Sequence, residues 1–153
     1  MQALGPIVAS IAVSYFAWKN YQLSERERKD GLHQHQVQVY HIVAEHSSAY
    51  SKHMMDYVFS KLPVEVNGLG LDGDERKPPR HYFDEAGKAL KRLRSIVHGG
   101  VRVYFPPTVA LEVELALEEI TREYEANRAG ASKVTLRQTG LESVLMDEMR
   151  MYK

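Results

Sequence analysis

Residues 1–18, MQALGPIVASIAVSYFAW, contain no charged side chain, whereas the chain beyond them is strongly polar. An α-helix rises about 1.5 Å per residue, so this run would span about 27 Å, close to the roughly 30 Å hydrocarbon core of a bilayer. Tyr15, Trp18 and Tyr21 gather at one end of it, as aromatic side chains do at a membrane interface. The sequence therefore predicts a transmembrane anchor over residues 1–21.

Two other interpretations of this run remain open. A cleavable signal peptide has a basic amino-terminal region and a small-x-small cleavage site, whereas this run ends in aromatic residues. A helix buried in a globular core normally has a polar face, and here only Ser10 and Ser14 provide one. Together with Gly5, these serines form a small-residue surface that favours helix association within a membrane. We therefore expect a homo-oligomer or a place in a membrane protein complex.

The charges that flank the run set its expected orientation. Lys19, Arg26, Arg28 and Lys29 follow it closely, and no Lys or Arg precedes it. Lys and Arg accumulate on the cytoplasmic side of a membrane segment. The sequence therefore predicts a single-pass membrane protein with its N-terminus outside and its C-terminal domain in the cytoplasm.

The composition of the chain sets the bounds for the remaining residues, 22–153. They are numerous enough for one domain with a hydrophobic core. Twenty basic and twenty acidic residues give no formal net charge, so no overall field attracts nucleic acid. The absence of cysteine excludes disulfides and thiolate ligands. We expect a single domain and no nucleic-acid partner.

Helical periodicity predicts that residues 22–153 form an all-α, antiparallel helical bundle. The first helix follows one long pattern from Ser24 to Leu62, continues from the anchor and ends before Pro63. A second helix begins after Pro79 and stops at residues 99–100, two glycines, since glycine readily adopts the left-handed conformation of a helix C-cap. The expected apolar positions of these helices are Val39, Ile42, Val43, His46, Ala49, Tyr50, Met54, Tyr57, Val58, Tyr82, Phe83, Ala86, Leu90, Leu93 and Val97.

Two further helices are predicted in the C-terminal part of the chain. Residues 101–107 are expected to form an extended link, because a residue before proline is pushed out of the α region. A third helix follows over residues 108–127, with an apolar face that widens through Leu111 and Leu115. A fourth begins at a capping box at Thr139 or somewhat earlier. Their expected inward positions are Val109, Val113, Leu117, Ile120, Tyr124, Leu141, Val144, Leu145, Met149 and Tyr152.

Residues 63–80 are rich in Gly, Asp and Pro and are predicted to form an irregular loop. Within it, residues 64–71 alternate around an Asn-Gly pair, which is also the signature of a small β-hairpin. Residues 72–75 are Asp-Gly-Asp-Glu, but the positions that follow lack the ligands and the glycine of an EF-hand loop. The segment therefore predicts a loop or a hairpin and no calcium site.

No residue pattern in the chain indicates catalysis or metal binding. His41 with Glu45 and His53 with Asp56 pair a histidine with an acid at helical spacing in the first long helix, whereas a metal site in a bundle needs several such pairs on facing helices. Phosphate-loop, dinucleotide-binding and nucleophile-elbow motifs are missing from the sequence. We therefore predict no catalytic, cofactor-binding or metal-binding residues and a protein that is not an enzyme. The histidines of the first long helix are His33, His35, His41, His46 and His53.

The second helix has a basic face that allows two interpretations. It could contact an anionic lipid or nucleic acid, or it could be a solvated face opposite the acidic third helix. We favour the solvated face, because the charge balance and the absence of a binding motif give no independent support for an anionic partner. The residues of this face are Arg80, Lys88, Lys91, Arg92 and Arg94.

The order of these parts resembles that of small uncharacterised bacterial membrane proteins, which have one N-terminal hydrophobic helix, a charged stretch and a helical domain. The chain differs from them in its final Met151-Tyr152-Lys153 and in a less basic stretch after the anchor. The resemblance implies an architecture and no activity. The matching parts are residues 3–18, 24–30 and 83–86 with Leu90 and Leu93, residues 104–107 with Val109, and residues 145–150.

Taken together, these features predict a membrane-anchored interaction or scaffold protein, or an accessory subunit of a membrane complex. The alternative is a membrane-bound regulator or defence-type effector whose bundle senses a ligand or partner. The expected partners are the lipid bilayer and other copies or subunits, whereas the sequence identifies no small-molecule ligand.

Overall fold

A computed structural model of the chain describes residues 4–62, 77–130 and 140–150, with side chains from residue 10 onward. Within these ranges the ordered elements are all helical, which confirms the predicted all-α class. The hairpin predicted at 64–71 and the start of the fourth helix at Thr139 lie outside the described residues, as do positions 72–75 and 151–153. The elements are α1 (Leu4–Ser60), α2 (Pro79–Ile96), η2 (Val97–Val101, a π-helix), α3 (Arg102–Tyr104), α4 (Pro107–Arg128) and α5 (Leu141–Arg150).

Helix α1 is continuous from the apolar run into the bundle, as the sequence predicts. It passes through Gly31, where an added Cβ would have no heavy atom within 4 Å, although glycine costs a helix about 1 kcal/mol relative to alanine. The chain divides into two compact units, Met1–His35 and Gln36–Lys153, so α1 contributes to both. No helix in the part of the chain that the structure describes is both long enough and apolar enough to cross a membrane. The transmembrane helix predicted over residues 1–21 thus receives no support from the fold.

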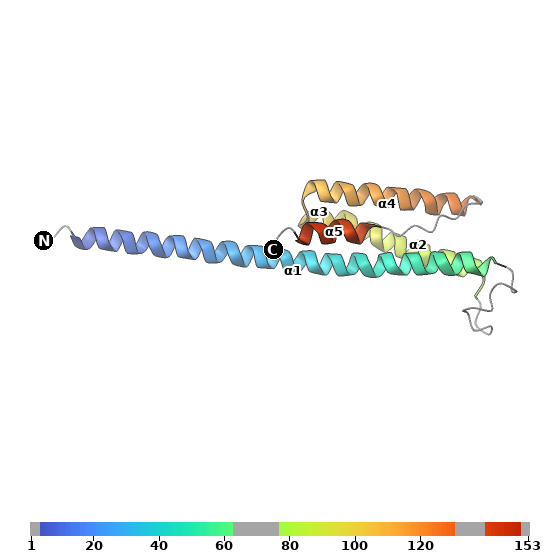
Figure 1. Ribbon diagram of the computed structural model, residues 1–153, viewed down its shortest axis with the longest axis horizontal. Coiled ribbons are helices and arrows are strands. Elements are labelled where there is room, and N and C mark those ends of the chain that lie inside the picture. Colours follow the sequence, from blue (N-terminus) through green and yellow to red (C-terminus); the bar gives the residue numbers. More distant parts are fainter. Residues whose placement is uncertain (1–3, 63–76, 131–139, 151–153) are drawn as a thin grey trace. The chain divides into compact units, whose positions relative to one another are not determined.

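The second unit is an antiparallel helical bundle, in agreement with the prediction (Figure 1). Successive helices α2, α4 and α5 reverse direction, and α2 runs beside residues 36–60 of α1. Prolines at the first positions of α2 and α4 fit these helix starts, where a backbone N–H has no partner within the helix. The completely buried apolar side chains come from all these helices and from η2: Val43, Ala86, Leu93, Val97, Val101, Val113, Leu141 and Leu145.

The buried face of α1 differs in part from the predicted stripe. Val39, Val43 and Tyr50 are buried as expected, but Ile42 is exposed. Gln36 and Ser47 are buried instead, and Gln36 donates a hydrogen bond of 2.8 Å to the carbonyl oxygen of Tyr104. Polar side chains can occupy buried positions when they satisfy a polar group such as this carbonyl.

The predicted stop of the second helix at residues 99–100 is wrong. The helical run continues from α2 through η2 into α3, and neither glycine has a positive φ. A Cβ on Gly100 would lie 2.9 Å from Cγ2 of Val39, so this glycine allows η2 to approach α1 closely. The described glycines in the left-handed conformation are Gly130, which follows the end of α4 with φ +86°, and Gly140, which precedes α5 with φ +66°.

The extended link predicted over residues 101–107 is also wrong over most of its length. Val101 is the last residue of η2, and the following three residues form α3. Only Phe105 (φ −115°, ψ 155°) and Pro106 have extended backbone. The restriction imposed by a proline reaches only the residue immediately before it, here Phe105 and Pro106.

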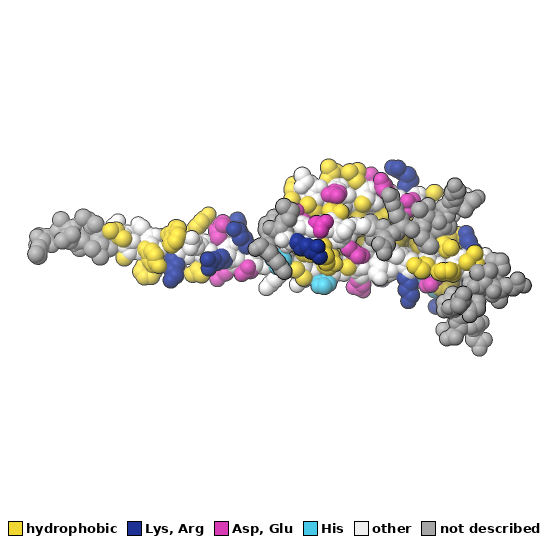
Figure 2. All heavy atoms as spheres, viewed as in Figure 1, with side chains coloured by type: hydrophobic (Ala, Val, Ile, Leu, Met, Phe, Trp, Pro, Cys, Tyr) yellow, Lys and Arg dark blue, Asp and Glu magenta, His cyan; other side chains and the backbone are white. Residues whose placement is uncertain are grey.

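Helix α4 spans the predicted residues to within one position at each end, and four of its predicted inward side chains are buried. The predicted widening of its apolar face is wrong, because Leu111 and Leu115 are 58% and 55% exposed. Figure 2 shows hydrophobic side chains along the outer side of α4. The buried positions follow one narrow stripe, and both leucines lie outside it.

An ion-pair cluster joins α4 to η2 and α3. Arg102 donates from Nε to Oε1 of Glu114 and from Nη2 to Oε2, the latter at 3.1 Å, which makes a bidentate pair. Nδ1 of His98 lies 3.8 Å from the same carboxylate. The hydrogen bond from Arg102 is the main reason why the pKa of Glu114 is lowered from its usual value.

Candidate functional site

The apolar segment, residues 10–18 of α1, exposes large hydrophobic side chains over more than half of the helix circumference. Successive residues are rotated by about 100° around the helix axis, so Ile11, Val13, Tyr15, Phe16 and Trp18 cover more than half of the circumference, and the remaining sector carries only Ser10, Ser14 and Ala17. Each of the five large side chains is between 54% and 68% exposed. Figure 2 shows hydrophobic side chains (yellow) along the N-terminal part of the described chain.

This distribution distinguishes the apolar segment from the surface of an ordinary amphipathic helix. A helix that lies on a globular core is apolar on one side and polar on the other, whereas a helix that is apolar on all sides is normally surrounded by protein or lipid. Ser14 reduces its polarity by donating a hydrogen bond of 2.9 Å to the carbonyl oxygen of Ser10. The segment therefore presents a surface for an apolar environment on all sides.

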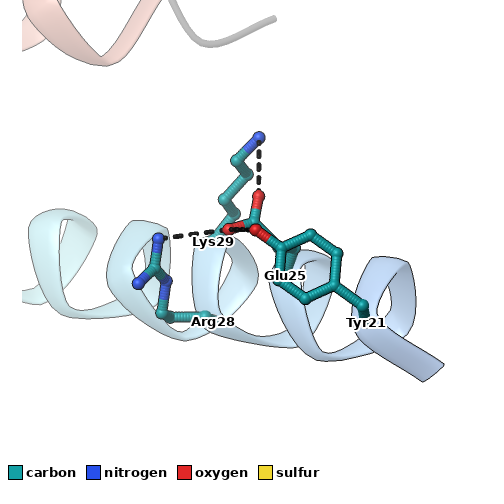
Figure 3. Close-up of polar contacts among 4 residues, drawn as sticks. All are labelled: Tyr21, Glu25, Arg28 and Lys29. Atoms are coloured by element: carbon teal, nitrogen blue, oxygen red, sulfur yellow. Dashed lines mark hydrogen bonds and ion pairs between the residues drawn. The ribbon is translucent and has the colours of Figure 1, made fainter. Parts of the chain in front are cut away.

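A cluster of polar side chains lies beyond Trp18, at residues 21–29 (Figure 3). The carboxylate of Glu25 accepts a hydrogen bond from the Tyr21 hydroxyl at 3.5 Å and from Arg28 at 3.4 Å, and it lies 3.9 Å from Nζ of Lys29. Because all four residues are on α1, the cluster gathers an aromatic ring and two cations around one carboxylate at the polar end of the segment.

A second candidate site, the basic hollow, lies within the bundle unit. Its volume is about 690 Å³, and it is open on one side. It is formed where the end of α1, residues 79–91 of α2 and the end of α4 come together. Its lining residues are Tyr57, Lys61, Pro79, Arg80, Phe83, Asp84, Gly87, Lys88, Lys91, Tyr124, Asn127 and Arg128.

Three aromatic rings, one from each helix, pack together in the wall of the hollow. Phe83 stacks on Tyr124 with ring centroids 4.4 Å apart and planes 6° from parallel, and it contacts Tyr57 at 5.0 Å. Offset aromatic packing of this kind adds about 1 kcal/mol per pair beyond area burial. The Tyr124 hydroxyl donates a hydrogen bond of 3.2 Å to the carbonyl oxygen of Phe83. These contacts hold the three helices together at this end of the bundle.

Gly87 allows this arrangement. A Cβ at that position would collide with the Tyr124 hydroxyl and would lie 3.1 Å from Cζ of the ring. The Tyr124 ring therefore lies against the backbone of α2, where any larger residue would displace it. Burial, followed by the charge of Asp84, raises the pKa of the Tyr124 hydroxyl.

Five cationic side chains and one carboxylate line the hollow. Arg80 lies 4.0 Å from Asp84, Lys88 lies 2.6 Å from Glu85, and Arg128 lies 3.8 Å from Glu125. Nζ of Lys61 lies 4.1 Å from the centroid of the Tyr57 ring. Lys91 has no ion pair with the residues that the structure describes.

Asn127 is a buried polar side chain in the wall of the hollow, with an exposure of 8%. Its Nδ2 donates a hydrogen bond of 2.9 Å to the carbonyl oxygen of Glu123. Its Oδ1 has no partner within the described part of the chain. Buried amide oxygens without a partner are uncommon in folded proteins.

The basic face predicted on α2 separates into two parts. Arg80, Lys88 and Lys91 line the hollow, whereas Arg92 and Arg94 do not. Arg94 donates a hydrogen bond of 3.2 Å to Oγ1 of Thr121 on α4. The sequence analysis missed the contribution of Lys61 and Arg128, because their proximity to α2 depends on how three helices pack.

The histidines of α1 and the acidic residues do not form a metal site in the described ranges, where no group of three potential ligands converges. Nδ1 of His53 is buried and has no hydrogen-bond partner there. The prediction that the protein has no catalytic or metal-binding residues stays a prediction.

The chain matches no protein-family model, no curated protein and no solved structure. Its resemblance to small bacterial membrane proteins therefore stays a prediction. The features that bear on function are the apolar segment and the basic hollow.

Proposed function

We propose that this protein is a membrane-attached interaction protein, acting as a scaffold or as an accessory subunit of a membrane complex. In this proposal residues 1–21 attach the chain to the bilayer, and the helical bundle contacts other proteins. The observation that carries the proposal is the exposure of large hydrophobic side chains over more than half of the circumference of the apolar segment, which has no charged side chain on any face.

The magnitude of this exposure favours lipid as the surroundings of the segment. Burying a large aromatic side chain removes about 150–250 Å² from water, and Tyr15, Phe16 and Trp18 each expose more than half of their surface. At about 25 cal/mol per Å², covering the exposed part of each ring contributes roughly 2–3 kcal/mol. Several such side chains give a driving force comparable to that of a stable association, and a bilayer covers all sides of a helix at once.

The position of the charges is consistent with this attachment. The side chains from Ile11 to Trp18 are uncharged, and the first ion-pair cluster surrounds Glu25. Tyr21, beside that cluster, is 65% exposed and has an apolar ring with a polar tip. Such side chains favour the headgroup layer, so we place the segment before Tyr21 in the hydrocarbon layer.

The bundle offers an exposed apolar surface to a protein partner. Leu111 and Leu115 are one helical turn apart on α4 and are both more than half exposed. Neither contributes to the core cluster. Pairs of this kind support the scaffold proposal, because covering them with a partner removes apolar surface from water.

Membrane fractionation of cells that express the full-length chain tests the attachment. We expect the protein to sediment with membranes and to resist carbonate extraction. The double variant Val13→Asp/Phe16→Asp should move to the soluble fraction, because carboxylates oppose insertion into hydrocarbon. Leu32→Asp, at an exposed position of α1 beyond the apolar segment, is the matched control and should remain with membranes.

Two outcomes of this experiment contradict the proposal. Wild-type protein that stays in the supernatant without detergent rules out attachment by the apolar segment. Release of the wild type by carbonate indicates peripheral association and rules out insertion of the segment into the hydrocarbon layer.

The predicted orientation, with the N-terminus outside and the C-terminal domain in the cytoplasm, has a separate test. The chain contains no cysteine, so a cysteine placed at Lys153 is the only thiol in the protein. We expect it to be protected from an impermeant thiol reagent in intact cells and to react after the membrane is opened. Reaction in intact cells would reverse the orientation and leave the attachment unaffected.

The alternative function is a membrane-bound regulator whose bundle binds a ligand. The basic hollow is the observation that favours it, because a concave site with convergent polar groups is the usual form of a small-molecule site.

A further inference from the structure

We propose that the basic hollow binds a phosphorylated small molecule that carries at least two negative charges. Its five cations come from three parts of the bundle: Lys61 follows α1, Arg128 ends α4, and the other three are on α2. Only one carboxylate, Asp84, is among the lining residues. This local excess of positive charge occurs in a chain whose formal net charge is zero.

Some of these cations stabilise a helix or pair with a carboxylate. Two of them, Lys61 and Lys91, do neither within the described ranges. Arg128 lies at the C-terminus of α4, where a cation is favoured by the helix dipole, and it also pairs with Glu125. Lys88 pairs with Glu85 on the same helix. Lys91, in contrast, lies in the interior of α2 and has no carboxylate partner within the described ranges.

Lys61 is the second cation whose charge is not neutralised by a carboxylate among the described residues. Its ammonium group lies 4.1 Å from the centroid of the Tyr57 ring, which lines the same hollow. A cation–π contact stabilises the charge without cancelling it. An anion in the hollow would therefore meet Lys61 and Lys91 as uncompensated charges from two different helical segments.

The size and shape of the hollow favour a compact anion. Its volume of about 690 Å³ lies within the roughly 300–1,000 Å³ that is typical of small-molecule sites. The cations surround one concavity, whereas a polymer backbone is usually bound along an extended basic stripe. Phosphate groups suit such a site, since each supplies several acceptor oxygens and up to two charges.

The aromatic wall gives the hollow a rigid base. Tyr57, Phe83 and Tyr124 are fixed against one another, and Gly87 leaves room for the Tyr124 ring. A preformed wall lowers the cost of ordering side chains when a ligand binds. Because the ligand is anchored by charge, its affinity should fall as salt is added.

Calorimetric titration of the full-length protein in uncharged detergent tests this proposal. The probes are inorganic pyrophosphate, ADP and a water-soluble inositol bisphosphate, with adenosine as the uncharged control. We expect at least one phosphorylated probe to bind at low ionic strength and adenosine not to bind. Strong binding by the inositol bisphosphate alone identifies an inositol phosphate, the chemistry of a lipid headgroup, and binding by pyrophosphate or ADP identifies a diphosphate or a nucleotide.

Substitutions at exposed positions assign the binding to the hollow without disturbing the core. Lys61→Gln and Lys91→Gln should each weaken binding about fivefold, and the double variant by about twenty-fivefold. Lys52→Gln, an identical change at an exposed position of α1 outside the hollow, should leave the affinity unchanged. Arg92→Gln provides the same control on α2, directly beside Lys91 in the sequence.

Three outcomes would overturn the proposal. The first is that no phosphorylated probe binds at low ionic strength. The second is binding that Lys61→Gln and Lys91→Gln leave unchanged, which would place the site elsewhere. The third is that a single-stranded oligonucleotide binds whereas none of the small phosphates does, which would indicate a surface for a nucleic-acid polymer. None of these outcomes affects membrane attachment, which fractionation measures separately.

Discussion

The two parts of α1 use similar apolar side chains in different patterns, and the difference separates a surface from a core. In the bundle part, Val39, Val43 and Tyr50 recur on one side of the helix and are at most 6% exposed. In the apolar segment, large side chains such as Phe16 and Trp18 lie on different sides of the helix and are more than half exposed. One-sided periodicity is satisfied by packing within the chain, whereas all-round hydrophobicity needs surroundings that the described chain does not supply.

The largest effect is expected from a charge in the bundle core. Leu117 is 3% exposed on α4, and Leu117→Asp buries a carboxylate without a partner. We expect a loss of several kcal/mol, comparable to the roughly 5–15 kcal/mol stability of a domain. Circular dichroism during denaturant titration of the full-length protein measures it. Leu115→Asp, two residues away and 55% exposed, is the control and should change the unfolding midpoint little.

Equal destabilisation by these two variants would contradict the buried stripe of α4. It would mean that another surface covers Leu115 in the folded protein, so that the outer side of α4 would be part of an interface.

Substitutions at two glycines, one in each unit, test the comparison between the two units. Gly87→Ala places a Cβ against the Tyr124 ring, and we expect it to destabilise the bundle by about 1–3 kcal/mol, the usual cost of overpacking. Gly31→Ala meets no atom within 4 Å, so it should stabilise α1 locally by up to about 1 kcal/mol. Denaturant unfolding measures the first change, and amide hydrogen exchange around residue 31 measures the second.

Tyr124→Phe provides the control for the first of these substitutions. It removes the hydroxyl that the new Cβ would meet first, so the double variant Gly87→Ala/Tyr124→Phe should lose less stability than the sum of the single variants. Strictly additive losses would show that the tight contact at Gly87 does not limit the packing.

The sequence predicts the bundle well where one-sided periodicity extends over several turns. The limits and inward face of α4 follow from Val109, Val113, Leu117 and Ile120, each of which is buried. Such a pattern determines both the helix and the side that packs, since burial of that side supplies most of the stability.

Local rules fail where tertiary contacts decide the conformation. Gly100 was expected to end a helix, but its lack of a side chain instead allows contact with Val39, which is distant in the sequence. The basic hollow could be predicted only in part for the same reason. Lys88 and Lys91 belong to one helical face, whereas the position of Lys61 beside them depends on packing between helices.

The pH dependence of the bundle should include a contribution from Glu114. Its pKa is lowered from 4.5 because Arg102 donates hydrogen bonds to the carboxylate. A lowered pKa in the folded state stabilises the protein above the usual carboxyl pKa, and this contribution disappears as the pH falls through the lowered value. The difference in unfolding free energy between wild type and Glu114→Gln should therefore be constant near neutral pH and shrink in acid.

Denaturant titrations of both proteins over a series of pH values measure this difference. Glu112→Gln, an exposed acid on the same helix, serves as the control for a general loss of negative charge. A difference for Glu114→Gln that grows as the pH falls would contradict the pairing with Arg102.

The smallest effect is expected in the polar cluster of the first unit, where every contact is exposed and local to α1. Glu25 accepts a hydrogen bond from Tyr21 and pairs with Arg28 and Lys29. Exposed pairs at this spacing each contribute about 0.3–0.5 kcal/mol. Glu25→Gln should thus speed amide exchange around residues 21–29 no more than severalfold and leave unfolding of the bundle unchanged, with Glu27→Gln as the neighbouring control. A loss of bundle stability as large as that expected for Gly87→Ala would show that the two units unfold together as one cooperative structure.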